Sequence, residues 1–293
     1  AGASGSVPPG YSRMEDLKAE YGRLPRRRDF GDTNHRISDR RDAGRPVIDD
    51  VSFEEPLSLG GLARPKPDAK DRPHDRDTIF VSIASFRDVQ CPLTIASMYT
   101  TAKSPARIFM GVIQQNEPQD IQCIPAIYNN CDPGQFCPAD NIRVRKVLPT
   151  EAKGPTYGRY VSMLMYRGEK YFMMIDSHNR FATHWDATLV SMYQGMKDEK
   201  RVLSHYPEAW WNPLDKPFKP NTPLDNRTTT TYLCDCRFTG MGFVKLNGIV
   251  TKARAQPMPQ PWASAGLVFA DAKLLDEVPF DPHLDFVFDG EEI

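Results

Sequence analysis

The chain has 293 residues and is almost neutral, with 37 basic and 38 acidic side chains. This balance gives no field that would attract nucleic acid or an anionic membrane surface. No stretch approaches the roughly 18 consecutive apolar residues of a membrane span, and the first residues lack the apolar centre of a signal peptide. We therefore predict a globular protein with no nucleic-acid partner and no membrane span in this chain. The sequence begins at Ala1 without Met, which leaves a lost upstream anchor as an open alternative.

Charge is concentrated in the first quarter of the chain. Residues 1–76 carry 29 charged side chains, 15 basic and 14 acidic, but only four aromatic ones. Such a segment cannot bury enough apolar surface to offset the entropy of ordering. We predict a flexible charged stem or linker over residues 1–76 and one folded domain over residues 77–293. A nucleic-acid arm is the alternative for the arginines, but the interleaved acidic residues disfavour it.

The folded region begins with a strand, a helix and a second strand. Residues 78–86 (TIFVSIASF) form an apolar, β-branched run that is typical of a buried strand. Residues 91–102 carry Pro in the first turn and apolar residues at helical spacing, which predicts a helix. Residues 106–115 predict the second strand. A βαβ unit of this length indicates a parallel sheet with a right-handed crossover.

Further elements follow along the chain. We predict a helix over 157–167 closed by Gly168, a strand over 170–176, a helix over 186–196, short antiparallel strands at 232–238, 242–246 and 248–253, and a strand running into a helix over 264–278. The Pro-rich residues 210–231 predict a surface excursion. The fold class is therefore α/β, with a mostly parallel central sheet flanked by helices and a smaller antiparallel part.

Polar residues follow two of the predicted strands, where open α/β sheets bind ligands. They are Ser85, Arg87 and Asp88 after the first strand, and Asp176, Ser177 and His178 after the strand over 170–176. Residues two apart in an extended segment point to the same side, so Asp176 and His178 can present an oxygen and a nitrogen to one point. Such a pair suits Mn²⁺ or a similar divalent cation when diphosphate oxygens complete the shell. A helix-capping Asp and a surface His are the alternative.

Residues 168–186 (GEKYFMMIDSHNRFATHWD), preceded by GPTYGRYVSMLMYR, resemble the DxH region of a family of N-acetylglucosaminyltransferases. This family includes the Skp1-type enzymes, which modify hydroxyproline, and the trypanosomatid mucin-type polypeptide enzymes. Three more blocks fit it in the same order: DTIFVSIASFRD, IFMGVIQQN, and the stretch from Ser264 to Ile293. The resemblance covers residues 77–293.

The resemblance implies a GT-A nucleotide-sugar fold and a retaining transfer of GlcNAc from UDP-GlcNAc to a hydroxyl group of a protein or peptide, with Mn²⁺ or another divalent cation. The same fold using UDP-GalNAc, and a non-catalytic relative that binds nucleotide sugar or glycan, are the alternatives. A metal-dependent hydrolase is disfavoured, because no nucleophile and base pair flanks the DxH motif.

The resemblance also assigns site residues. Its metal ligands fall on Asp176 and His178, with Ser177 between them in the nucleotide-sugar site, and its diphosphate-facing arginine falls on Arg159. The uridine-binding strand end falls on Ser85, Phe86 and Arg87. The small-residue turn that makes room for the donor sugar falls on Ala265 and Gly266.

The acidic pair near the reacting centre falls on Glu291 and Glu292, which we predict to orient the sugar or the acceptor hydroxyl. Family sequences continue with segments that supply a further histidine to the metal. The resemblance therefore implies a domain that is incomplete at its C-terminal end.

The chain has six cysteines, and whether they form disulfides indicates the cellular compartment of the protein. The spacing of Cys123, Cys131 and Cys137 disfavours a structural zinc site and leaves disulfides within this cluster as an expectation. Disulfides would favour the Golgi or another secretory lumen, with the cytoplasm as the alternative.

Overall fold

The computed structural model describes residues 8–13, 77–125, 127–128, 131–132, 134–207, 229–240, 242, 244–281 and 283–287. Most of the predicted stem and most of the Pro-rich stretch 210–231 lie outside these residues. The helices are α2 (Cys91–Thr101), α3 (Pro155–Met163), α4 (Trp185–Gly195) and α5 (Leu274–Glu277). The strands are β1 (Ile79–Phe86), β2 (Ile108–Gln115), β3 (Ile142–Val147), β4 (Tyr171–Asp176), β5 (Val202–Ser204), β6 (Thr229–Phe238), β7 (Val244–Lys252) and β8 (Leu267–Asp271).

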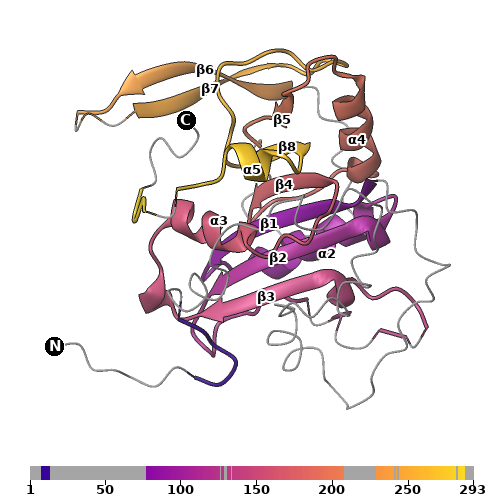
Figure 1. Ribbon diagram of the computed structural model, residues 1–293, viewed down its shortest axis with the longest axis vertical. Helices are drawn as coiled ribbons and strands as arrows, with labels where there is room; N and C mark the ends of the chain where they lie inside the picture. Colours follow the sequence, from indigo (N-terminus) through magenta and orange to yellow (C-terminus); the bar gives the residue numbers. More distant parts are fainter. Residues whose placement is uncertain are drawn as a thin grey trace.

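A six-stranded sheet in the order β3-β2-β1-β4-β8-β5 forms the centre of the molecule (Figure 1). Strands β1 to β4 run parallel, β8 is antiparallel to β4, and β5 is antiparallel to β8. Strands β6 and β7 form a separate antiparallel hairpin at one end of the molecule. This arrangement confirms the predicted α/β class, with a mostly parallel sheet and a smaller antiparallel part.

Helices cover both faces of the sheet, which explains the long apolar runs in β1 and β4. One core contains Val81 and Ile83 of β1 together with side chains from α2 and α4. The other contains Phe80 of β1 with side chains from α3 and α5. Successive residues of β1 therefore enter opposite cores, and both faces of the strand are buried from Ile79 to Ile83.

Several elements differ from the prediction. Helix α3 starts and ends earlier than residues 157–167, whereas Gly168 does adopt the expected left-handed conformation at φ 92°. The two strands predicted around residue 247 are one strand, β7. It continues through Gly248, where an added Cβ would stand 2.2 Å from the Thr231 side chain. The glycine is therefore required by the close approach of two strands and does not mark a turn.

Strand β3 (IRVRKV) was not predicted, because its arginines interrupt the apolar pattern. Both Arg143 and Arg145 are nevertheless buried. Arg143 forms an ion pair of 2.8 Å with Glu169, which is fully buried, and donates to the carbonyl oxygen of Met165. This long-range pair compensates the buried charge and links β3 to the chain that follows α3.

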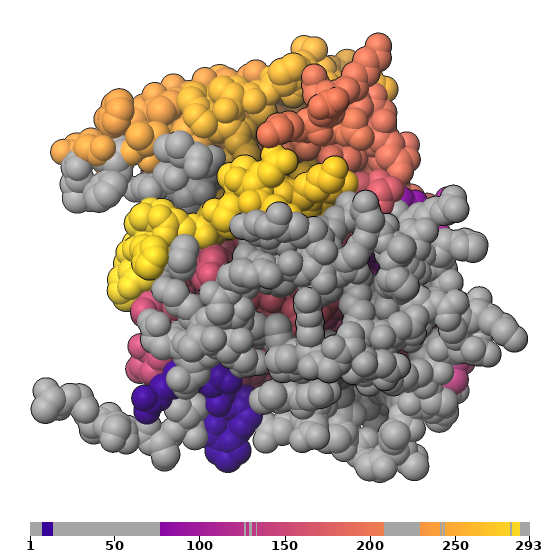
Figure 2. Space-filling view, in the orientation of Figure 1, coloured from indigo at the N-terminus to yellow at the C-terminus, as the bar shows by residue number. Residues whose placement is uncertain are grey.

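Residues 8–13 lie against the outer edge of the sheet, although they belong to the predicted stem. Tyr11 forms a parallel bridge with Lys146 of β3, and the Ser12 N–H donates to the Lys146 carbonyl at 2.7 Å. Figure 2 shows this segment, in indigo, on the surface of the molecule. In the part of the chain that the structure describes, no helix is long and apolar enough to cross a bilayer.

Candidate functional site

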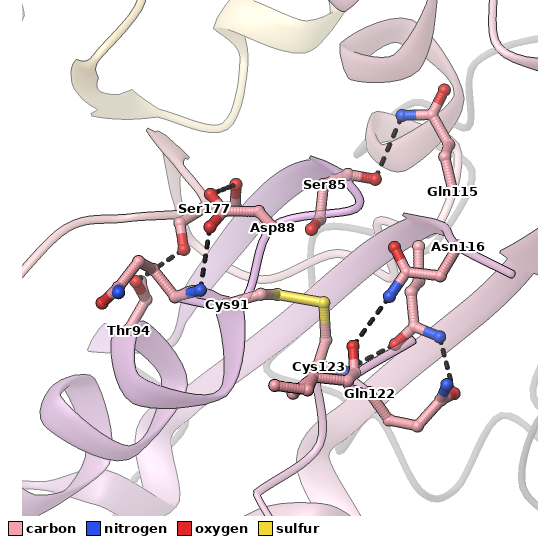
Figure 3. Close-up of a disulfide and its surroundings, with 12 residues drawn as sticks. Ser85, Asp88, Cys91, Thr94, Gln115, Asn116, Gln122, Cys123 and Ser177 are labelled. Atoms are coloured by element: carbon pink, nitrogen blue, oxygen red, sulfur yellow. Dashed lines mark hydrogen bonds between the residues drawn. A yellow bond between two sulfur atoms is a disulfide. The ribbon is translucent and has the colours of Figure 1, made fainter. Parts of the chain in front are cut away.

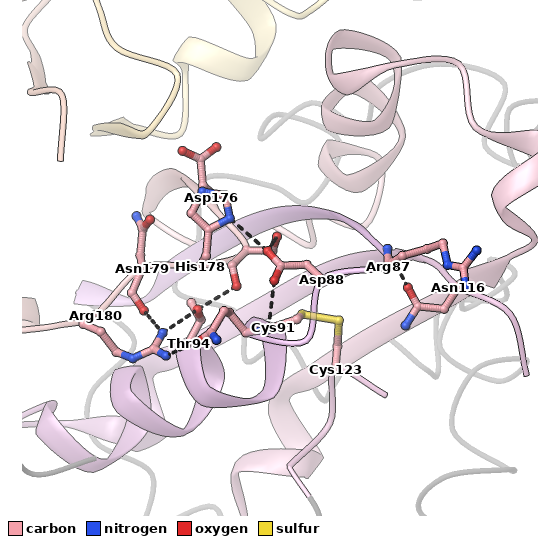
Figure 4. A network of polar contacts seen from close by, with 12 residues as sticks. Arg87, Asp88, Cys91, Thr94, Asn116, Cys123, Asp176, His178, Asn179 and Arg180 are labelled. Carbon is pink, nitrogen blue, oxygen red and sulfur yellow. Dashed lines mark hydrogen bonds and ion pairs between the residues drawn. A yellow bond between two sulfur atoms is a disulfide. The ribbon is translucent and has the colours of Figure 1, made fainter. Parts of the chain in front are cut away.

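The carboxyl ends of β1 and β4 bring the two predicted polar segments together. These strands are neighbours, and Ala84 lies opposite Asp176 in the parallel register. The chain beyond each strand therefore emerges at the same edge of the sheet, where α/β proteins bind ligands. Figure 4 shows Asp88 between Arg87 on one side and the Asp176 and His178 pair on the other.

Arg159 of α3 holds the Asp176 carboxylate. Its Nη2 lies 2.8 Å from Asp176 Oδ1, and its Nη1 donates to the carbonyl oxygen of Ala265 at 3.0 Å. Only 6% of Arg159 is exposed, whereas 32% of the Asp176 side chain is, so this charge-assisted contact is buried on the arginine side only. One arginine thus joins the end of β4 to the turn that precedes β8, and it gives Asp176 a fixed orientation.

The turn at Ala265 and Gly266 packs directly on this carboxylate. The Gly266 N–H donates to Ser264 Oγ at 3.1 Å, and its carbonyl oxygen accepts from Asn179 Nδ2 at 3.1 Å. A Cβ added at Gly266 would stand 2.6 Å from Pro207 Cδ and 3.2 Å from Asp176 Oδ2. The backbone can approach Asp176 this closely only because residue 266 has no side chain.

We therefore expect Gly266→Ala to destabilise the fold by about 1–3 kcal/mol, the usual cost of overpacking, by displacing Pro207 or Asp176. Urea denaturation measures the change. Gly195→Ala, at the end of α4, is the matched control, because a Cβ there meets nothing within 4 Å. Equal stability of the two variants would contradict the close packing described above.

His178 and Ser177 both bind Asp88, which follows β1. His178 Nδ1 lies 2.9 Å from Asp88 Oδ2, and Ser177 Oγ donates to the same oxygen at 2.6 Å. Burial acts to raise the pKa of Asp88, but hydrogen bonds from His178, Ser177 and the Gln90 backbone outweigh it and lower this pKa. The hydrogen bond to Asp88 raises the pKa of His178, against the effect of burial.

The predicted uridine-binding residues lie at the end of β1. Ser85 is fully buried, and its Oγ has no hydrogen-bond partner among the described residues. Phe86 leaves 55% of its surface exposed. Arg87 has a positive φ of 48°, and its Nε lies 2.9 Å from Asp120 Oδ2. The pKa of Asp120 is lowered, because Arg87 donates a hydrogen bond to it.

A disulfide between Cys91 and Cys123 connects the first residue of α2 to the loop that follows β2 (Figure 3). Gln114 Oε1 accepts the Cys123 N–H at 2.6 Å, and Asn116 Nδ2 donates to the Ile121 carbonyl at 2.8 Å. The loop that carries Asp120 is therefore fixed to the same helix start as Asp88.

The disulfide pairing corrects part of the expectation. Cys131 and Cys137 do pair within the expected cluster, but Cys123 pairs outside it, with Cys91. Cys234 and Cys236 are free.

The structure brings most of the predicted site together. Five predicted residues lie together at the end of β4: Asp176, His178, Arg159, Ala265 and Gly266. Ser177 is connected to His178 through Asp88, to which both side chains hydrogen-bond. Glu291 and Glu292 lie outside the described residues. Sequence reasoning missed the role of Asp88 as a partner of His178. Its position after a buried strand was the only signal, since the two residues are 90 positions apart.

The donor set suits a divalent cation that shares its coordination with a ligand. Asp176 offers a carboxylate oxygen and His178 an imidazole nitrogen, a mixture found at Mn²⁺ sites. Among the residues that the structure describes, no group of three or more His, Cys, Asp or Glu side chains is arranged to hold a metal. A cation here would therefore take further ligands from elsewhere, such as diphosphate oxygens.

The fold and the site define a class: an open α/β protein with a polar ligand site at the carboxyl edge of its sheet. Comparison with protein families identifies the chain more closely. The model of the family described as glycosyltransferase (GlcNAc) matches residues 78–138 and 126–293. The chain belongs to this glycosyltransferase family. No curated protein matches the sequence.

Proposed function

We propose that the chain transfers N-acetylglucosamine from UDP-GlcNAc to a Thr, Ser or hydroxyproline hydroxyl of a protein, with a divalent cation and with retention of configuration. The observation that carries this proposal is the meeting of Asp176 and His178 with Arg159 and the Gly266 backbone at the carboxyl edge of the sheet. Membership of the GlcNAc glycosyltransferase family supports GlcNAc as the sugar that is transferred.

Asp176 and His178 would hold Mn²⁺ together with the diphosphate of the donor. When bound, the cation supplies positive charge where the departing diphosphate gains negative charge. Arg159 keeps the Asp176 carboxylate in place and adds a second, buried positive charge near the same point. The Ala265 and Gly266 turn lets the backbone pack against this carboxylate, and we assign this turn to the border of the donor-sugar site.

Other residues have roles in binding. Ser85, Phe86 and Arg87 would hold the uridine, and the exposed Phe86 ring suits stacking on the base. Glu291 and Glu292 would orient the sugar or the acceptor hydroxyl. Attack from the face of the departing diphosphate needs no dedicated nucleophile, because a phosphate oxygen can take the proton of the acceptor. We therefore assign no catalytic base.

The test combines the chain with UDP-GlcNAc, Mn²⁺ and peptides that contain Thr or hydroxyproline. We expect UDP release, an α-linked GlcNAc product by NMR, and loss of turnover with EDTA. UDP-GalNAc in a parallel reaction tests the choice of donor. A β-linked product would overturn retention. UDP binding with Mn²⁺ but no turnover would favour the non-catalytic nucleotide-sugar-binding alternative, which the two-residue donor set also fits.

The two disulfides support a proposal on compartment. Structural disulfides persist in oxidising environments and are rare in the cytosol. Cys91 and Cys123 are both fully buried, so their bond is part of the core of the fold. We propose a secretory compartment such as the Golgi, where protein glycosylation takes place on luminal hydroxyl groups.

A further inference from the structure

We propose that Asp88 fixes the tautomer of His178, so that Nδ1 carries the hydrogen and Nε2 carries the lone pair that binds the divalent cation. The inference rests on the proposed function, in which Asp176 and His178 hold that cation. Asp88 acts through His178 and is therefore a positioning residue.

The hydrogen bond between the two side chains sets the tautomer. An ionised carboxylate can only accept, so the Nδ1 of His178, 2.9 Å from Asp88 Oδ2, supplies the hydrogen. A neutral imidazole with a hydrogen on Nδ1 has its lone pair on Nε2. Histidines that bind metals commonly donate their other ring N–H to a carboxylate, which also fixes the plane of the ring.

Asp88 is itself held in one orientation. Its Oδ1 accepts the Gln90 N–H at 2.8 Å, and its Oδ2 accepts the Ser177 hydroxyl at 2.6 Å. Thr94 of α2 donates to the Ser177 carbonyl oxygen at 2.7 Å. The start of α2 therefore fixes both the carboxylate and the segment that carries His178, as Figure 4 shows. The hydrogen bonds determine which oxygen faces the imidazole.

Asp88 does not join the cation site as a ligand. Within the described ranges, Asp88, Asp176 and His178 do not form a group of three side chains able to hold a metal. Each Asp88 oxygen is also occupied by hydrogen bonds from the chain itself. We therefore assign the cation to Asp176 and His178, and the contribution of Asp88 passes through the imidazole.

The test uses Asp88→Asn, which keeps the shape of the side chain. The amide oxygen is expected to keep the position that accepts the Gln90 N–H, which turns the NH₂ group toward His178. His178 Nδ1 must then accept, and the hydrogen moves to Nε2. Long-range ¹H–¹⁵N spectra of the metal-free chain, labelled at its six histidines, report the tautomer directly. His178→Gln assigns the signal.

At a pH well above the raised pKa of His178, where the imidazole is neutral, we expect the Nδ1–H tautomer in the wild-type chain and the Nε2–H tautomer in Asp88→Asn. Because the Nε2 lone pair is then lost, we expect Mn²⁺ affinity in the presence of UDP to fall by about 10- to 100-fold, as measured by electron paramagnetic resonance. Asp271→Asn is the matched control. It alters a carboxylate of β8 opposite Tyr171, at the end of β4 away from His178, and both readouts should stay unchanged.

Ser177→Ala is a second variant that removes one hydrogen bond to Asp88 and leaves the His178 contact in place. We expect it to retain the Nδ1–H tautomer, with circular dichroism to check folding of every variant. A wild-type Nε2–H tautomer, or full Mn²⁺ affinity in Asp88→Asn, overturns the inference while the proposed function stands. A wild-type chain that binds no Mn²⁺ with UDP overturns both.

Discussion

Asp176→Asn is expected to lower the rate of GlcNAc transfer by about 100- to 1,000-fold, the scale on which removal of one electrostatic stabiliser acts. The amide is isosteric with the carboxylate but carries no charge, so it binds a divalent cation weakly. It also leaves the buried Arg159 without its anionic partner, which lies 2.8 Å away. Initial rates at saturating Mn²⁺ and UDP-GlcNAc measure the effect.

Asp271→Asn is the control for this variant. Asp271 lies on β8 opposite Tyr171, at the end of β4 away from Asp176, and its Oδ1 accepts the nearby Lys273 N–H. We expect its rate to remain within a few-fold of the wild type. If Asp176→Asn and Asp271→Asn show the same rate of metal-dependent turnover, Asp176 is not a ligand of the catalytic cation.

Removal of the Cys91 and Cys123 disulfide, by alanine at both positions, is expected to lower the free energy of unfolding by about 3–4 kcal/mol. The bond closes a loop with a sequence separation of 32, and the estimate is the entropy that such a cross-link removes from the unfolded chain. Urea denaturation without reductant measures it. The replaced sulfur atoms also leave space in the core, which adds to the loss.

The matched control replaces the two free cysteines, Cys234 and Cys236, which lie on the hairpin strand β6. Their replacement by Ser should change stability by less than about 1 kcal/mol. Should the two double variants unfold at the same urea concentration, the disulfide would not stabilise the fold. If uridine binding is weaker in the variant without the Cys91 and Cys123 disulfide but not in the Cys234 and Cys236 variant, the loop carrying Asp120 positions Arg87.

Elements with a regular local pattern could be predicted from the sequence. The apolar run of β1 predicts a strand and the helical spacing of α2 predicts a helix, because each pattern is complete within about ten residues. Strand β3 could not be predicted this way. Its buried Arg143 is compensated by Glu169, 26 residues away, and by the Met165 carbonyl oxygen, 22 residues away. A local pattern contains no information on such a partner.

The candidate site follows the same division. Asp176 and His178 are close in sequence, so their shared side of the chain could be predicted from the period of an extended segment. The contacts of Asp88 with His178, and of Gly266 with Asp176, join positions 90 apart. Their existence depends on the order of strands in the sheet, which places β1 and β8 on either side of β4.

The contact between residues 8–13 and β3 covers part of an open edge of the sheet. Strand β3 is an outermost strand, and such strands offer unpaired backbone groups to other molecules. The bridge from Tyr11 to Lys146 occupies part of that edge from within the same chain. A protein shortened to begin at residue 77 would lose this bridge, and the β3 backbone at Lys146 would then be open to pairing with a strand of another copy.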